Sequence, residues 1–225
     1  MLSIRLGGQG EGLRAVLCLG AHCDDIEIGC GGTLLRLMQE HPGLSVHWIV
    51  LSSTPLRAEE ARLAAESFLS SAGEKFLTIH EFADGFFPYH GAAIKECFES
   101  LKRDVSPDLI FTHYRQDLHQ DHRIASELTW NTFRDHLILE YEIPKYDGDF
   151  GSPGLFTVLQ ESVCERKIDI ILSSYHSQSA KRWFARDLFM STMRLRGLEA
   201  NSPTGLAEGF YCRKTVLWAH DGQSA

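Results

Sequence analysis

One short polar stretch constrains this chain more than any other, residues 21–33, which read Ala-His-Cys-Asp-Asp-Ile-Glu-Ile-Gly-Cys-Gly-Gly-Thr. It follows an apolar run, Ala15–Leu19, and precedes a segment with helical periodicity. A strand, a polar turn and a helix in this order predict the first βα unit of an α/β fold, and such a turn lies at the carboxyl edge of the sheet, where ligands bind. The turn carries one imidazole, His22, and two adjacent carboxylates, Asp24 and Asp25. These are groups that a catalytic zinc site uses.

Apolar runs alternate with amphipathic segments along the rest of the chain. This alternation predicts a single-domain α/β fold, Rossmann-like and doubly wound, with a mostly parallel sheet and helices on both faces. We expect residues 14–219 to form this domain, residues 1–13 to be a flexible lead-in and residues 220–225 to be a tail. The expected strands are 15–19, 45–51, 76–80, 109–112, 137–141, 155–159 and 210–219, and the expected helices are 31–40, 55–73, 92–104, 121–135, 161–173 and 183–198.

A second polar cluster follows the expected strand 109–112 and contains His119, Asp121 and His122. The carboxyl ends of the first and fourth strands can meet at the switch point of a doubly wound sheet, so we expect the two clusters to converge. Helix capping offers an alternative explanation, because an aspartate near a helix N-terminus stabilises the helix by about 0.3–1 kcal/mol. Capping accounts for one aspartate in each cluster, Asp24 and Asp121, but not for two histidines three residues apart and a second acidic pair. The pattern therefore favours a metal site.

The two stretches His22–Thr33 and His119–His122 resemble the PIG-L/LmbE-like family of zinc-dependent de-N-acetylases. The signature of that family is Ala-His-Pro-Asp-Asp, followed by a stretch of the His-Pro-Asp-His type. Two further segments fit, His176–Gln178 and Ala207–Phe210, so the resemblance covers about residues 14–215. It implies a hydrolase that removes an N-acetyl or related N-acyl group from an amino sugar or glycoconjugate, by attack of a zinc-activated water.

The resemblance also implies a role for each matched residue. Zn²⁺ is the expected cofactor, with Fe²⁺ or another divalent ion as an open alternative. The implied zinc ligands are His22, Asp25 and His122, the general base is Asp24, the group that stabilises the oxyanion or protonates the leaving amine is His119, and the carboxylate that orients His119 is Asp121.

The sequence departs from the family signature at two positions. Cys23 and Gln120 stand where the family usually has proline, and neither is a ligand position. A thiolate is a good zinc ligand, so Cys23 is an alternative ligand. We expect its side chain to point away from the metal, because it lies between two residues with other roles.

Substrate contacts are less constrained by the pattern. We expect Lys145, in the loop after the fifth strand, to close over a sugar, and Asp117 to contact the substrate from the second cluster. Arg182 belongs to a basic stretch for which two interpretations stay open: a solvated helix face, or a contact with a phosphate, since the guanidinium fork matches phosphate geometry. The expected partner is an N-acetylated amino sugar, and whether it is linked to a phosphate or a nucleotide stays open.

Composition excludes several other classes of function. The net charge of −8 argues against nucleic acid or an anionic membrane as the main partner. No apolar run reaches the roughly 18 residues of a membrane span. The six cysteines form no CxxC pair, which predicts reduced thiols in the cytoplasm. A homo-oligomer stays possible, as do two rival functions on the same fold: a Mg²⁺-dependent domain that binds a nucleotide or sugar, and a non-catalytic subunit.

Overall fold

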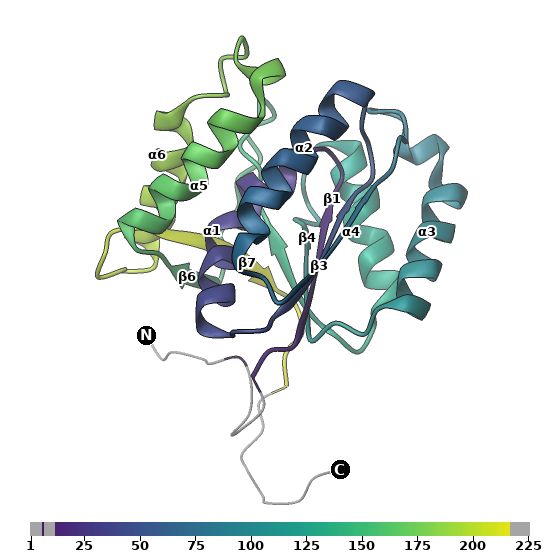
Figure 1. Cartoon of the computed structure of the whole chain (residues 1–225), viewed down its shortest axis with the longest axis horizontal. Coiled ribbons are helices and arrows are strands. Elements are labelled where there is room, and N and C mark those ends of the chain that lie inside the picture. Colours follow the sequence, from purple (N-terminus) through teal and green to yellow (C-terminus); the bar gives the residue numbers. More distant parts are fainter. Residues whose placement is uncertain (1–5, 7–11, 217–225) are drawn as a thin grey trace, which may run out of the picture.

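The computed structural model describes residue 6 and residues 12–216, and in these residues a seven-stranded sheet carries helices on both faces (Figure 1). The strands are β1 (Ala15–Gly20), β2 (Ser45–Val50), β3 (Glu74–Ile79), β4 (Leu109–His113), β5 (Leu137–Tyr141), β6 (Leu155–Val158) and β7 (Ala207–Cys212). The α-helices are α1 (Asp25–Glu40), α2 (Pro55–Phe68), α3 (Gly91–Asp104), α4 (Gln120–Thr132), α5 (Glu161–Ser174) and α6 (Arg186–Glu199). Short 3₁₀ turns are η1 (Leu69–Ser71), η2 (Phe87–Tyr89) and η3 (His176–Gln178).

The strand order, β3-β2-β1-β4-β5-β7-β6, confirms the predicted doubly wound fold. Strands β1 to β5 pair in parallel, and β7 runs antiparallel to both β5 and β6. From β1 the chain winds outward through β2 and β3, and it then returns to add β4 and β5 on the other side of β1. The switch point therefore lies between β1 and β4, which puts the two polar clusters at neighbouring strand ends.

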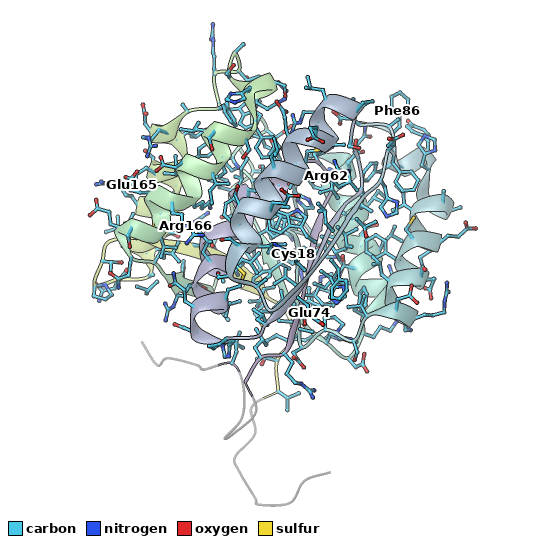
Figure 2. All side chains as sticks on the ribbon, viewed as in Figure 1. Cys18, Arg62, Glu74, Phe86, Glu165 and Arg166 are labelled. Carbon is cyan, nitrogen blue, oxygen red and sulfur yellow. The ribbon has the colours of Figure 1, made fainter. Side chains whose placement is uncertain are left out.

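Alternate residues of β1 point into two different cores, as expected for a strand buried on both faces. Val16 and Cys18 pack in the core under α1, α2, α5 and α6, whereas Leu17 and Leu19 pack in the core under α3 and α4. Side chains fill the space between the sheet and both helix layers (Figure 2). This packing leaves the polar ends of the strands as the place for a site.

Helix α1 begins at Asp25, six residues before the predicted start at residue 31. Glycines at positions 29, 31 and 32 weaken the helix pattern in the sequence, because glycine disfavours helix interiors. Packing requires them: a Cβ at Gly29 would overlap the ring of Tyr141, and one at Gly31 would lie 2.8 Å from Phe68. The acidic motif consequently lies on the first helical turn, where backbone geometry is fixed, and not in a loop.

Other boundaries differ by smaller amounts. The last strand lies at Ala207–Cys212, not 210–219, and residues 217–219 fall outside the described part of the chain. In the loop at 84–88, Phe86 is exposed and Phe87 is fully buried. The predicted tail, and all of the predicted lead-in except residues 6, 12 and 13, also lie outside the described residues. None of the helices in the described residues has both the length and the apolar character needed to cross a bilayer.

Candidate metal centre

The turn after β1 is closed by its own side chains. The backbone N–H of His22 donates to Asp25 Oδ2 over 2.6 Å, which holds the carboxylate beside the imidazole. Asp24 occupies the N-cap position of α1, but its side chain makes no capping hydrogen bond. Both aspartates are buried. Helix capping therefore does not explain why Asp24 is present.

The turn between β4 and α4 is built in a similar way. Asp117 Oδ1 accepts the N–H of His119 over 2.7 Å, and the imidazole of His119 caps α4 by accepting the N–H of Asp121 over 3.3 Å. The carboxylate of Asp121 instead accepts the N–H groups of Gly85 and Phe87 over 2.6 and 3.1 Å. Capping of α4 thus does not explain Asp121 either, and His122 follows on the first helical turn.

Three of the predicted ligands converge where these two turns meet. His22 Nδ1 lies 3.2 Å from His122 Nε2 and 3.4 Å from Asp25 Oδ2, and His122 Nε2 lies 3.6 Å from Asp25 Oδ1. Ligand atoms about 2.0–2.1 Å from a tetrahedral zinc ion are about 3.3 Å apart. The spacing and the chemistry of these donors therefore fit one divalent cation, with room for water or substrate at the remaining positions.

A carboxylate faces the second nitrogen of each of the two imidazoles. His122 Nδ1 lies 3.0 Å from Asp117 Oδ2, and His22 Nε2 lies 3.3 Å from Asp121 Oδ2 and 3.1 Å from Asp84 Oδ1. Such partners fix the tautomer and the ring orientation of metal-binding histidines and raise their basicity. The arrangement leaves Nδ1 of His22 and Nε2 of His122 free to bind a metal.

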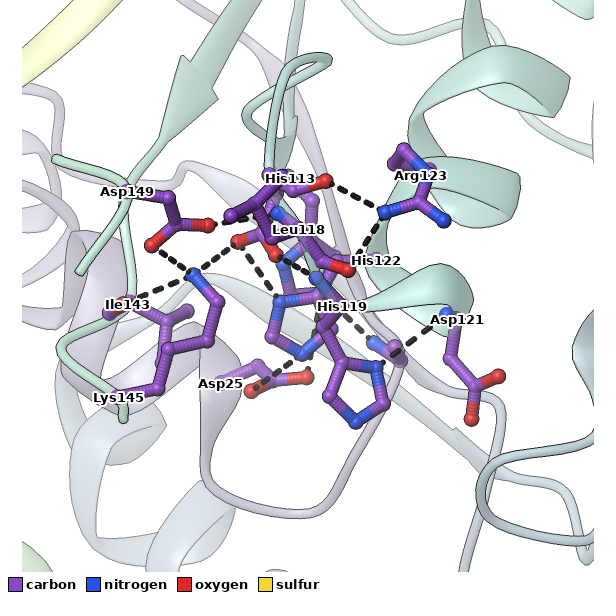
Figure 3. Close-up of polar contacts among 12 residues, drawn as sticks. Asp25, His113, Leu118, His119, Asp121, His122, Arg123, Ile143, Lys145 and Asp149 are labelled. Atoms are coloured by element: carbon purple, nitrogen blue, oxygen red, sulfur yellow. Dashed lines mark hydrogen bonds and ion pairs between the residues drawn. The ribbon is translucent and has the colours of Figure 1, made fainter. Parts of the chain in front are cut away.

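Lys145 extends the support of His122 by one further residue. Its ammonium lies 2.8 Å from Asp117 Oδ2 and 2.6 Å from Asp149 Oδ1, so it neutralises the carboxylates behind the imidazole (Figure 3). Asp117, for which we expected a substrate contact, is 1% exposed and is not among the residues that line the cavity described below. The physical reason is its position between Lys145 and His122, which occupies its oxygens.

Replacing Lys145 with methionine is expected to weaken metal affinity by about 10- to 100-fold, because Asp117 loses its cation and holds His122 less firmly. Lys145→Arg keeps the charge and should recover part of the loss. Competition with a fluorescent chelator measures the affinity. Lys181→Met, at another lysine of the same cavity, is the control and should bind metal as the wild type does. Unchanged affinity in the Lys145→Met protein would contradict the supporting role.

Electrostatics keep two of the three candidate ligands, His122 and Asp25, in the forms that bind a metal. Burial opposes protonation of His22, but hydrogen bonds with Asp121, Asp25 and Asp84 raise its pKa well above the usual value, so a metal ion has to displace its proton. Burial, together with the neighbouring imidazole of His113, lowers the pKa of His122 to about 3, so the ring is neutral at physiological pH. Burial opposes ionisation of Asp25, but His122 and His113 outweigh it and hold its pKa well below the usual range. A neutral imidazole and an ionised carboxylate are the ligand forms that metal binding needs.

Asp24 differs from Asp25 in its surroundings. Its Oδ1 pairs with Arg57 Nη2 over 3.0 Å, while its Oδ2 is buried and has no hydrogen-bond partner among the described residues. Burial raises the pKa of Asp24, and the nearby Arg57 works against this rise. Asp24 therefore presents a free carboxylate oxygen that no other protein group uses, next to the three converging donors.

His119 lies against both candidate ligands, with ring centroids 4.8 Å from His22 and 4.6 Å from His122. Burial, and then the positive charge of His22, lower its pKa. The carboxylate of Asp121 does not contact the His119 ring, contrary to the orienting role that we expected. Residues two apart at the start of a helix do not face each other, and Asp121 turns toward His22 and the backbone at Gly85.

Cys23 points away from the three donors, as expected. Its thiol donates to the carbonyl of Ser52 over 3.4 Å, and burial raises its pKa to about 12. The group is a neutral thiol at physiological pH, and only a thiolate is a strong metal ligand.

A cavity of about 250 Å³ opens beside the three donors. Lys145 lines it, but Arg182 does not: Arg182 is exposed, while its neighbours Lys181 and Trp183 reach the cavity. Sequence reasoning missed two further lining residues, Arg57 from α2 and Asp84 from the loop after β3, because no motif marks them and only the fold brings them here. Tyr146, beside Lys145 in the loop after β5, and Gln178, from the segment His176–Gln178, also line the cavity.

Three other groups of side chains in the described residues could each hold a cation: Asp25–His113–His122, His22–Asp84–Asp121 and His22–His119–His122. In the first, His113 Nε2 lies 2.9 Å from the N–H of Ala21 and is occupied by it. In the second, the oxygens of Asp121 already accept two backbone N–H groups. The donors of His22, Asp25 and His122 carry fewer such bonds than these two groups, since Asp25 Oδ2 alone among them accepts a backbone N–H. The group with His119 shares His22 and His122 with this set, but the imidazole of His119 already caps α4.

The chain is similar to known proteins in sequence and in fold. Residues 17–133 match the family described as PIG-L, GlcNAc-PI de-N-acetylase. The uncharacterized deacetylase YaiS of Escherichia coli (strain K12) is 30% identical over an alignment of 145 residues that covers 58% of this chain and 75% of YaiS.

Two solved structures have the same fold. The conserved protein TT1542 from Thermus thermophilus superposes with a TM-score of 0.72 at 23% identity, over 93% of this chain and 99% of TT1542. The N,N'-diacetylchitobiose deacetylase from Pyrococcus horikoshii superposes with a TM-score of 0.69 at 18% identity, over 88% of this chain and 83% of that enzyme. At these identities the structures show the shared fold, and the match to residues 17–133, just over half of the chain, carries the family assignment.

Proposed function

Because this chain belongs to the PIG-L (GlcNAc-PI de-N-acetylase) family, we propose that it is a metal-dependent hydrolase that removes an N-acetyl group from an amino sugar or its glycoconjugate. The products are acetate and a free amine. The observation that carries the proposal is the convergence of His22, Asp25 and His122 at 3.2–3.6 Å, beside the free oxygen of Asp24. Zinc is the proposed ion, since two imidazoles and one carboxylate suit it, and Fe²⁺ is an alternative.

A divalent cation at these donors would polarise the acetyl carbonyl and lower the pKa of a bound water to about 7. In the proposed reaction, Asp24 Oδ2 takes the proton of the attacking water, because it is a buried carboxylate oxygen in the cavity wall that has no partner among the described residues and is not a proposed ligand. Arg57 holds the other oxygen of Asp24 and so fixes the direction of proton transfer. His119, which lines the cavity, stabilises the developing oxyanion or delivers a proton to the leaving nitrogen.

The proposed substrate is an N-acetylated amino sugar of the kind that the family description names, N-acetylglucosamine included. Lys181 lines the cavity and has no acidic partner within 4.0 Å among the described residues, and the exposed Arg182 follows it. These two cations support a form of the proposal in which the sugar carries a phosphate. All six cysteines are free thiols, in keeping with the cytoplasm as the proposed compartment.

Acetate release from a panel of sugars tests the proposal. The panel contains N-acetylglucosamine, its 1-phosphate and N,N'-diacetylchitobiose. We expect acetate and amine in equal amounts from at least one of them, loss of the activity after chelation, and recovery with Zn²⁺ or Fe²⁺. Absence of acetate from the whole panel, together with binding of Mg²⁺ alone, would favour the rival of a sugar- or nucleotide-binding domain. Full activity in metal-free protein would contradict the metal-dependent mechanism.

A further inference from the structure

Gln178 is a buried amide in the wall of the cavity that the proposed reaction does not use. It ends the short turn η3 (His176–Gln178), which connects α5 to the segment leading into α6. Its side chain is 4% exposed, yet the residue lines the cavity together with Asp24 and Arg57. A buried side-chain amide normally finds hydrogen-bond partners for both its oxygen and its nitrogen. The contacts of Gln178 therefore show which of these two atoms lacks a partner.

The contacts of Ser177 fix which way this amide points. Ser177 donates its backbone N–H to Glu60 Oε1 over 2.7 Å and its hydroxyl to Glu60 Oε2 over 2.6 Å. The single hydroxyl hydrogen is therefore committed to the carboxylate, and Ser177 Oγ can only accept a second bond. Gln178 Nε2 supplies it over 2.8 Å. If the amide were flipped, Gln178 Oε1 would face Ser177 Oγ, and neither atom could donate a hydrogen to the other. The hydrogen-bond network therefore excludes the flipped amide.

The oxygen of the same amide is left without a partner. Gln178 Oε1 is buried and accepts no hydrogen bond from any described residue. The amide is tied to the proposed base, since Glu60 forms an ion pair with Arg57 at 3.8 Å and Arg57 pairs with Asp24 at 3.0 Å. The wall of the cavity thus holds one oriented hydrogen-bond acceptor at a fixed place relative to Asp24.

We propose that Gln178 determines substrate specificity by accepting, at Oε1, a hydrogen bond from a ring hydroxyl of the N-acetylated amino sugar. The inference rests on the proposed function for the class of ligand. An oriented carbonyl oxygen selects donors, so it favours a hydroxyl and disfavours an anion or a deoxygenated position. The neighbouring Trp183 presents an aromatic ring to the same cavity, as pockets for small ligands commonly combine apolar walls with a few placed polar groups.

Equilibrium binding to the metal-loaded protein tests this assignment without requiring turnover. The probes are N-acetylglucosamine and its 3-, 4- and 6-deoxy analogues, measured by calorimetry against the wild type and Gln178→Met. One deoxy analogue should bind the wild type about tenfold more weakly than the parent sugar, which is the effect of one lost neutral hydrogen bond. Gln178→Met should bind the parent about tenfold more weakly and should no longer distinguish that analogue from it.

Two further variants keep the result interpretable. Ser177→Ala frees the amide to rotate and should give a smaller loss with the same analogue, and Gln160→Met, at an exposed glutamine outside the cavity, should bind every probe as the wild type does. The assignment is overturned if Gln178→Met binds all four sugars like the wild type, or if it weakens all of them while the wild type discriminates none. A wild type that binds in the expected pattern but releases no acetate would contradict the proposed reaction and leave this assignment standing.

Discussion

Replacing Asp24 with asparagine is expected to lower kcat by about 10²- to 10⁴-fold while the protein keeps its metal. General-base catalysis contributes rate factors of this size, and asparagine fills the same space without accepting the proton. Asp24 is the predicted residue for this effect because its Oδ2 is buried and unpaired among the described residues, while Arg57 holds Oδ1. Steady-state kinetics with the best substrate of the panel, alongside metal analysis of the same preparation, measures both quantities.

The control for this experiment is Asp135→Asn, at a side chain that is 90% exposed and remote from the cavity. It should leave kcat and metal content unchanged. If Asp24→Asn keeps more than about a tenth of the activity, Asp24 is not the base. If Asp24→Asn instead loses the metal, Asp24 is a ligand and the assignment of Asp25 must be revised.

Replacing His122 with alanine is expected to abolish metal binding and to lower kcat/KM by at least about 10³-fold. Its Nε2 is one of only three donors in the proposed set, and the cation supplies several kcal/mol of transition-state stabilisation. The change also leaves the carboxylates of Asp25 and Asp117 without the imidazole that now lies between them. Metal content per chain and acetate release are the two readouts.

His136→Ala provides the control, because His136 is a partly buried histidine whose one ion pair in the described residues is with Asp135. Circular dichroism establishes whether each variant folds. A folded His122→Ala protein that binds zinc with wild-type affinity would remove His122 from the ligand set.

Sequence reasoning could propose where the candidate site lies because sheet topology brings its two halves together. Once the chain is read as a doubly wound sheet, the turns after β1 and β4 must be neighbours, whatever lies between them in the sequence. His22, Asp25 and His122 could be proposed as neighbours for this reason and from the family signature. The residue types at those positions then indicate the chemistry.

The other residues of the cavity could not be predicted from sheet topology or from the family signature. Arg57 and Asp84 reach the cavity from two separate elements, and no spacing along the chain links them to the motifs. The start of α1 was misplaced because Gly29 and Gly31 look like helix breakers in the sequence, whereas their role is to admit the rings of Tyr141 and Phe68. Such contacts depend on tertiary packing, which overrides local preference.

The contacts of Asp117 and Asp121 could not be predicted from the sequence either. Both stand in the second cluster, and proximity in sequence suggested a substrate contact for one and an orienting bond to His119 for the other. In the fold, Asp117 supports His122, and Asp121 faces His22 and the backbone of the loop after β3. Which imidazole each carboxylate meets depends on side-chain direction at the start of α4, and the sequence pattern does not specify that direction.

In the proposed site, two loops far apart in the chain share a single cation. Anomalous diffraction from crystals grown with zinc tests this arrangement most directly. We expect one strong peak, about 2.0–2.2 Å from His22 Nδ1, His122 Nε2 and a carboxylate oxygen of Asp25. A peak that lies instead among His22, Asp84 and Asp121, or among Asp25, His113 and His122, would contradict the assignment. So would the absence of any peak between the two turns.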